Sequence, residues 1–259
     1  MTQPSDAVAE IMRLLAQEPV FLAGSCVAAE AHGLTTFADV DLFVPTQQVL
    51  MTTSQILLSS GAVLDDRFSR VWHRWKRYGL KGWHTNSLKL ELLSGIEVNV
   101  IYKMVDGHPT TSLAQVLESF DFGLLGMGYD LESGQYKDMR PYLFPGWHIG
   151  GPLPMMPNKR DNWRNGFISQ YNGLREAGRY AKYHGYGYDL SLVADDLVHG
   201  YRMAAMYHST SFNEDKQLLA QIYTRIADLI EADDMYELTE SYQQLDFNDP
   251  LDQILEALE

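Results

Sequence analysis

The sequence has one cysteine, no long apolar run and no excess of basic residues, and each absence excludes a class of protein. Its single cysteine, Cys26, cannot form a disulfide within the chain, as is usual in the reducing cytoplasm. No stretch approaches the roughly 18 apolar residues of a transmembrane helix. The N-terminal stretch MTQPSDAVAEIMRLLAQEP lacks the basic start and apolar core of a secretory signal. We therefore expect a cytoplasmic protein without a membrane span.

Basic residues are scarce, and the net charge of −14 argues against broad nucleic-acid binding. The excess of acids is concentrated in residues 211–259, which hold 13 acidic and two basic residues, so the preceding chain is close to neutral. One basic stretch, residues 67–81, interleaves six Lys or Arg with Trp and Tyr. Such a stretch can bind a nucleic-acid strand, but we favour a solvated strand and turn with inward-packed aromatics.

Hydrophobic periodicity predicts an α/β (α+β) fold with two parts. Alternation typical of strands and short helical patterns fill the first 140 or so residues, and a helical period dominates after residue 160. Between them, residues 141–158 hold five prolines and three glycines, which is typical of a connecting loop. We expect an α/β domain over residues 1–145 and a helical domain over residues 146–259. The longest predicted helices are 47–59, 163–184, 190–208 and 214–231.

One short motif carries chemistry, the Asp39-Val40-Asp41 sequence at the start of the second predicted strand, residues 40–44. Residues i and i+2 of a strand project from the same face, so both carboxylates share a side while Val40 points into the core. Two such acids are costly unless a cation neutralises them, and Mg²⁺ prefers oxygen ligands. Gly24-Ser25, at a strand-to-helix turn, allows close backbone approach and offers free N–H groups to phosphate.

This order of residues resembles the nucleotidyltransferases of the DNA polymerase β type. The chain has Gly24-Ser25, then thirteen residues, then Asp39-Val40-Asp41-Leu42. The stretches 117–122 (LESFDF) and 182–186 (KYHGY) are also similar to predicted bacterial and phage nucleotidyltransferases. The resemblance implies a polymerase β-like palm with a mixed sheet, followed by a mostly helical domain. It also implies Mg²⁺ or Mn²⁺ as cofactor and a nucleoside triphosphate as substrate.

This sequence differs from that family at the position of the third carboxylate. Its expected position, on a later strand, is occupied by Asn99, which can ligate a metal weakly but cannot accept a proton as a base. Glu97 lies two residues earlier on the same strand face and could substitute, and Glu91 on the preceding strand is a second candidate.

The sequence therefore predicts a metal-dependent nucleotidyltransferase that moves a nucleoside monophosphate to a hydroxyl acceptor. The acceptor stays open: an RNA or tRNA end, a small molecule or a protein. Because of Asn99, the alternative is a catalytically weak nucleotide-binding protein acting as an antitoxin, inhibitor or phage accessory protein. A third reading is a structural protein with a chance motif. The expected roles are catalytic for Asp39, Asp41 and Glu97; metal-binding for Asp39, Asp41, Glu97 and Asn99; and nucleotide-binding for Gly24, Ser25, Arg179 and Lys182.

Overall fold

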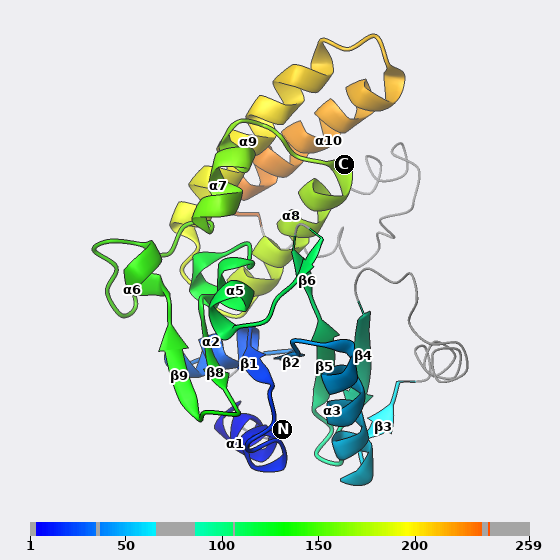
Figure 1. The fold of residues 1–259 in the computed structure, drawn as a ribbon. Coiled ribbons are helices and arrows are strands. Elements are labelled where there is room, and N and C mark those ends of the chain that lie inside the picture. The colour runs from blue at the N-terminus through cyan, green and yellow to red at the C-terminus, as the bar shows by residue number, and fades with distance from the viewer. Residues whose placement is uncertain (1–3, 35–36, 66–85, 106, 235–237, 239–259) are drawn as a thin grey trace. The chain divides into compact units, whose positions relative to one another are not determined.

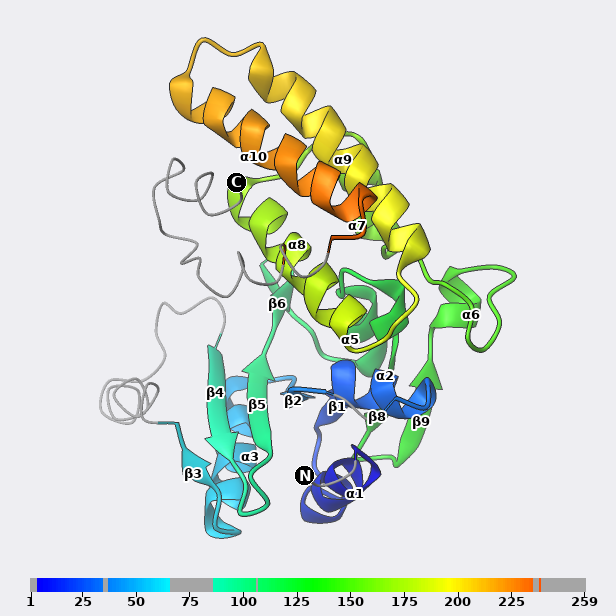
Figure 2. The same ribbon diagram turned by 180° about the vertical axis from the view of Figure 1, so that it is seen from behind.

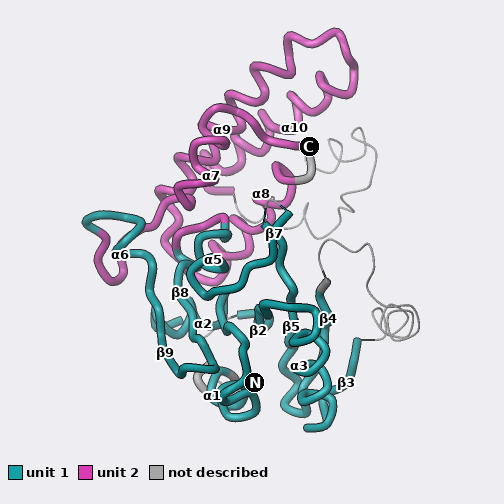
Figure 3. Tube along the Cα trace, in the orientation of Figure 1, with its two compact units in different colours: residues 1–120, 124–146 teal, residues 121–123, 147–259 magenta. Residues whose placement is uncertain are grey.

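A computed structural model describes residues 4–34, 37–65, 86–105, 107–234 and 238. The chain divides into two compact units, shown in Figure 3. The first comprises residues 1–120 and 124–146, and the second comprises residues 121–123 and 147–259. The basic stretch 67–81 lies outside the described residues.

The first unit is built on a mixed sheet of seven strands (Figure 1). Its strand order is β3-β4-β5-β2-β1-β8-β9, in which β2 and β5 are parallel and the other neighbours antiparallel. The strands are β1 (Phe21–Ala23), β2 (Asp39–Phe43), β3 (Val63–Leu64), β4 (Asn86–Glu91), β5 (Glu97–Tyr102), β8 (Met127–Asp130) and β9 (Gln135–Asp138). A separate pair joins β6 (Met104–Val105) to β7 (His108–Pro109).

The central strands of this sheet have one apolar and one polar face. On the apolar face, Val40 of β2 lies opposite Val98 of β5, and Leu42 lies opposite Val100; all four are fully buried. Asp39 and Asp41 alternate with these residues and therefore share the other face. The core thus holds β2 in a register that keeps both carboxylates together, since a slip of one residue would bury them instead.

Short helices complete the first unit. The strand-to-helix turn at Gly24 leads into α2 (Ser25–Ala31). Thr46 caps α3 (Gln47–Ser59) through a hydrogen bond from the backbone N–H of Val49 at 3.1 Å. Leu50 and Leu57 form the buried side of α3, which packs near β5 (Figure 2). The helices are α1 (Pro4–Leu14), α2 (Ser25–Ala31), α3 (Gln47–Ser59), α5 (Leu113–Glu118) and α6 (Arg140–Leu143). A 3₁₀ turn, η1 (Gly123–Leu125), begins at the last residue of the segment 121–123 and continues into the first unit.

The described part of the second unit is helical. It contains α7 (Pro157–Arg164), α8 (Gln170–Gly185), α9 (Ser191–Ser209) and α10 (Glu214–Glu231). The last two pack along each other as an antiparallel hairpin, drawn yellow and orange in Figure 1. Tyr201 of α9 and Tyr223 of α10 are fully buried between the helices, with ring centroids 5.5 Å apart.

The single helix expected over residues 163–184 is wrong, because α7 ends at Arg164 and α8 begins only at Gln170. Gly166 explains the interruption: a Cβ there would lie 2.9 Å from the backbone nitrogen of Ala204. The chain thus leaves the helix where its backbone packs directly against α9. The mixed α/β fold with a mixed sheet and a helical C-terminal part is confirmed.

Candidate functional site

The carboxylates of Asp39 and Asp41 converge on one point beside β5. The side-chain nitrogen Nδ2 of Asn99 donates to Asp39 Oδ2 at 2.7 Å and to Asp41 Oδ1 at 3.0 Å. Asn99 is the register partner of Asp41 on the parallel neighbour strand, which places its amide between the two acids. A single atom is therefore within hydrogen-bonding distance of both carboxylates.

The turn after β1 lies against the same carboxylate pair. Gly24 has φ 99° and ψ −156°, a backbone conformation essentially restricted to glycine. A Cβ at this position would stand 2.9 Å from Asp41 Oδ2. The turn and the carboxylate are therefore in direct contact, and only glycine satisfies both the backbone and the space. Ser25 begins α2 and is buried, 3% exposed.

Cys26 lies beneath this turn and is fully buried. Burial raises the pKa of its thiol well above the ordinary value, and the negative charge of Asp41 raises it further. A thiol in this state is not a nucleophile, and Cys26 serves as a small buried side chain.

Glu97, the expected third carboxylate, has an ion-pair partner on the next strand. Lys89 Nζ of β4 lies 2.6 Å from Glu97 Oε2. In the register, Lys89 is opposite Asn99, and Glu97 lies between Asp39 and Glu91. The polar face thus has two rows across three strands, Asp41-Asn99-Lys89 and Asp39-Glu97-Glu91.

A hollow of about 360 Å³ adjoins the β4 side of this polar face. Its polar lining comes from Lys89, Glu91, Glu97 and Asp65, and the rest from β3 and β4. Lys89 is the one functional candidate here that sequence reasoning missed. The signal was present in the alternating run LKLE, in which Lys89 and Glu91 share a face.

Arg179 and Lys182, the expected nucleotide-binding residues, both lie on α8. Arg179 Nη1 pairs with Asp121 Oδ2 and lies 3.6 Å from Glu176 Oε1. Lys182 Nζ stands 5.8 Å from the ring centroid of Tyr186, a cation–π distance. The binding of nucleotide by these two side chains stays a prediction.

Asp121 forms ion pairs with several basic side chains of the second unit. Its carboxylate is 9% exposed and is also approached by Lys159 at 3.7 Å and Arg175 at 3.4 Å. The cationic side chains that pair with Asp121 lie on α7 and α8. No sequence pattern near Asp121 predicts these long-range ion pairs.

Glu176, the second acid of this cluster, is also buried. Arg175 donates to its Oε1 from Nε at 2.9 Å and from Nη2 at 2.7 Å, and its Oε2 has no hydrogen-bond partner. Burial, followed by the charge of Asp121, raises the pKa of Glu176 to about 7, against the opposing effect of Arg179 and Arg175.

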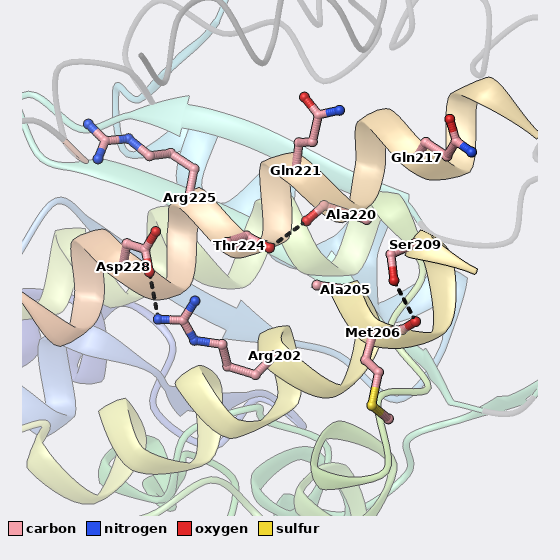
Figure 4. A pocket seen from close by; sticks show the side chains of 10 residues that line it. All are labelled: Arg202, Ala205, Met206, Ser209, Gln217, Ala220, Gln221, Thr224, Arg225 and Asp228. Carbon is pink, nitrogen blue, oxygen red and sulfur yellow. Dashed lines mark hydrogen bonds and ion pairs between the residues drawn. The ribbon is translucent and has the colours of Figure 1, made fainter. Parts of the chain in front are cut away.

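An open groove of about 690 Å³ runs between α9 and α10 (Figure 4). Arg202 closes one part of it through an ion pair to Asp228 at 2.5 Å, and Ala205 and Met206 contribute apolar surface. None of the residues expected to act in catalysis or nucleotide binding lines this groove.

The donor set at the carboxylate pair fits one divalent cation. Two carboxylates already direct an oxygen each at a common neighbour, and hard cations favour such oxygens. Among the residues that the structure describes, no group of three or more His, Cys, Asp or Glu side chains is placed to hold a metal.

None of the described helices is long and apolar enough to cross a membrane.

The fold and site define a mixed α/β unit with paired carboxylates behind a glycine turn, followed by a helical unit. Comparison with protein-family models and with curated proteins finds no match. Among solved structures, the chain is similar to one described as "The structure of CCA-adding enzyme apo form I". The identity is 11% and the TM-score 0.45, over 98% of this chain and 69% of that chain. At those values the likeness says nothing about activity.

Proposed function

We propose that this protein is a metal-dependent nucleotidyltransferase that transfers a nucleoside monophosphate from a nucleoside triphosphate to a hydroxyl acceptor. One observation carries the proposal: Asp39 and Asp41 both lie within hydrogen-bonding distance of the same Asn99 nitrogen. The contact between the Gly24 turn and Asp41 supports it, because strand, turn and carboxylates form one local surface.

Asp39 and Asp41 would hold a Mg²⁺ or Mn²⁺ ion through one oxygen each. The bound ion would neutralise phosphate charge and orient the triphosphate. Asn99 can accommodate it by presenting its carbonyl oxygen in place of its amide nitrogen. Gly24 leaves room for close approach of substrate to the backbone, since it has no side chain. We assign nucleotide contacts also to Ser25, Arg179 and Lys182.

The transfer is a displacement at phosphorus. The acceptor oxygen bonds to the α-phosphorus, the bond from that phosphorus to its bridging oxygen breaks, and pyrophosphate leaves. The acceptor's proton passes to water. Catalysis of this kind depends on positioning and charge neutralisation rather than on a protein nucleophile, which agrees with the buried state of Cys26.

The second candidate function is nucleotide binding without efficient transfer. A specific observation favours it: the third-carboxylate position holds a neutral amide, and the nearby Glu97 is already paired with Lys89 at 2.6 Å. No carboxylate at position 99 is then available to accept the acceptor's proton.

One experiment separates the two. The full chain is incubated with each α-labelled nucleoside triphosphate, Mg²⁺ or Mn²⁺, and either total RNA or a cell lysate. Label transfer that Asp41→Asn abolishes supports the enzyme. Nucleotide-dependent thermal stabilisation without transfer, under either metal, supports the binder. Absence of both transfer and stabilisation would overturn the two proposals together.

A further inference from the structure

The position expected for a third carboxylate holds a neutral amide, and a lysine lies beside it on the next strand. Asn99 presents its amide nitrogen to Asp39 and Asp41. Directly opposite on β4, Lys89 carries a positive charge and lies 2.6 Å from Glu97. Lys89 therefore occupies the same row as Asp41 and Asn99, on the same face of the sheet.

The charges on this face decide how many cations it suits. A second divalent ion beside the first is favoured by a further oxygen ligand with negative charge next to the first pair. Asn99 supplies no negative charge there, and Glu97 is half-exposed and directed to Lys89. A second ion would lie in the row Asp41-Asn99-Lys89, beside the ammonium group of Lys89. The ammonium group would repel that ion, because like charges repel each other at short range.

We propose that the site takes a single divalent cation, and that Lys89, held by Glu97, supplies the second positive charge. The inference rests on the proposed function and specifies its metal requirement. Lys89 is suited to this role because its compact ammonium carries three donors on a flexible stem. It is 23% exposed, and it lines the 360 Å³ hollow beside β4 together with the carboxylates of Asp65, Glu91 and Glu97.

The stoichiometry of Mn²⁺ tests the inference without an activity assay. Bound Mn²⁺ is counted by electron paramagnetic resonance on the full chain, with a non-hydrolysable α,β-methylene triphosphate present at saturation. The wild type should bind one Mn²⁺ per chain. Lys89→Gln combined with Asn99→Asp should bind two, because the double change removes the ammonium and adds the missing carboxylate.

Label transfer gives the second readout. Lys89→Gln should reduce it about 100-fold, as the loss of one preorganised hydrogen-bond donor does in other enzymes, and Lys89→Arg should restore most of it. Lys137→Gln, an exposed lysine on β9 of the same sheet, is the control and should change neither readout. A merely structural ion pair would not alter the Mn²⁺ count.

The outcomes separate this inference from the proposed function. Two Mn²⁺ ions in the wild type would overturn the inference and leave the nucleotidyltransferase proposal standing. One ion in both the wild type and the double variant would also overturn it. No bound Mn²⁺ in the wild type with any nucleotide would overturn both. If Lys89→Gln does not fold, the Mn²⁺ counts of the wild type and of Asn99→Asp test the inference. Each protein should then bind one ion, because Lys89 is still present in both.

Discussion

Asn99 donates its side-chain amide to Asp41 at 3.0 Å across the parallel strands β2 and β5. The same nitrogen reaches Asp39 at 2.7 Å, so a neutral donor occupies the place between two carboxylates that a cation would take. This bridge lets the carboxylate pair exist in the folded chain without an ion, because each acid accepts a hydrogen bond. A cation must then displace the amide nitrogen, and the metal affinity of the site depends on how readily Asn99 turns.

Asp41→Asn should abolish the thermal stabilisation that Mn²⁺ and nucleotide produce, while leaving the metal-free protein no less stable. The variant keeps an oxygen for Asn99 and removes a negative charge from a like-charged pair. In the wild type, ligand at about 100 times its Kd should add about 2.7 kcal/mol to the free energy of unfolding. Differential scanning fluorimetry with and without Mn²⁺ and each triphosphate measures both effects.

The control for Asp41→Asn is Glu132→Gln, which removes one negative charge from an exposed turn of the same unit. It should retain the full stabilisation. If Asp41→Asn keeps the metal-dependent shift, the carboxylate pair is not the metal site.

Gly24→Ala should both destabilise the first unit and weaken Mn²⁺ binding. Any residue with a Cβ adopts the backbone conformation of Gly24 at a cost of about 1–3 kcal/mol. The added methyl group would also lie only 2.9 Å from Asp41 Oδ2, which is too close. Gly134→Ala is the matched control, since its φ is +68° but a Cβ there meets nothing within 4 Å. Urea unfolding should show a loss in both variants, whereas Mn²⁺ titration should show a loss in Gly24→Ala alone. Equal metal affinity in the two variants would contradict the contact.

The parts of the site that the sequence predicts are those that depend on short-range patterns. Alternation in a strand places Asp39 and Asp41 on one face, and the Gly24 turn lies a fixed distance before them. Both follow from periodicity and from backbone sterics, which act over a few residues. The burial of Val40 and Leu42 on the opposite face confirms this part of the reasoning.

The pairing of Lys89 with Glu97 depends instead on hairpin register. A two-residue turn at Ser94-Gly95 would place Lys89 opposite Val100, on the apolar face. The actual hairpin closes with a hydrogen bond from Leu92 N to Ile96 O and pairs Glu91 with Glu97, so Lys89 lies opposite Asn99. Asp121 is a similar case, because its cations come from helices more than thirty residues away along the chain.

Glu176→Gln should remove part of the pH dependence of stability. The pKa of Glu176 is raised from 4.5 to about 7 in the folded protein, so the folded state keeps a proton that the unfolded state releases. The wild type should therefore lose stability as the pH rises from about 4.5 to about 7, because the unfolded state binds fewer protons in that window. The glutamine stays neutral and keeps an oxygen for Arg175.

Urea unfolding of the wild type and Glu176→Gln at pH 5, 6, 7 and 8 measures the effect as the difference between the two proteins. That comparison cancels the titration of His32 and His208, whose lowered pKa values act with the opposite sign. Relative to the wild type, the variant should gain stability as the pH rises to 7. Parallel curves for the two proteins would show that Glu176 does not titrate in this window.

Two helical glycines should respond with opposite signs to the same substitution by alanine. A Cβ on Gly200 of α9 would lie 2.3 Å from Trp163 Cδ1 and 2.7 Å from the carbonyl oxygen of Trp163. The backbone oxygen cannot move aside as a side chain can, so the overpacking cost of about 1–3 kcal/mol should exceed the helix-propensity gain of about 1 kcal/mol. A Cβ added at Gly185, at the end of α8, would meet nothing within 4 Å. Gly185→Ala should therefore raise the free energy of unfolding by about 0.4–1 kcal/mol, because alanine makes the unfolded chain less flexible. Urea unfolding followed by tryptophan fluorescence compares the two, and stabilisation by Gly200→Ala would mean that α7 and α9 are not in contact at Trp163.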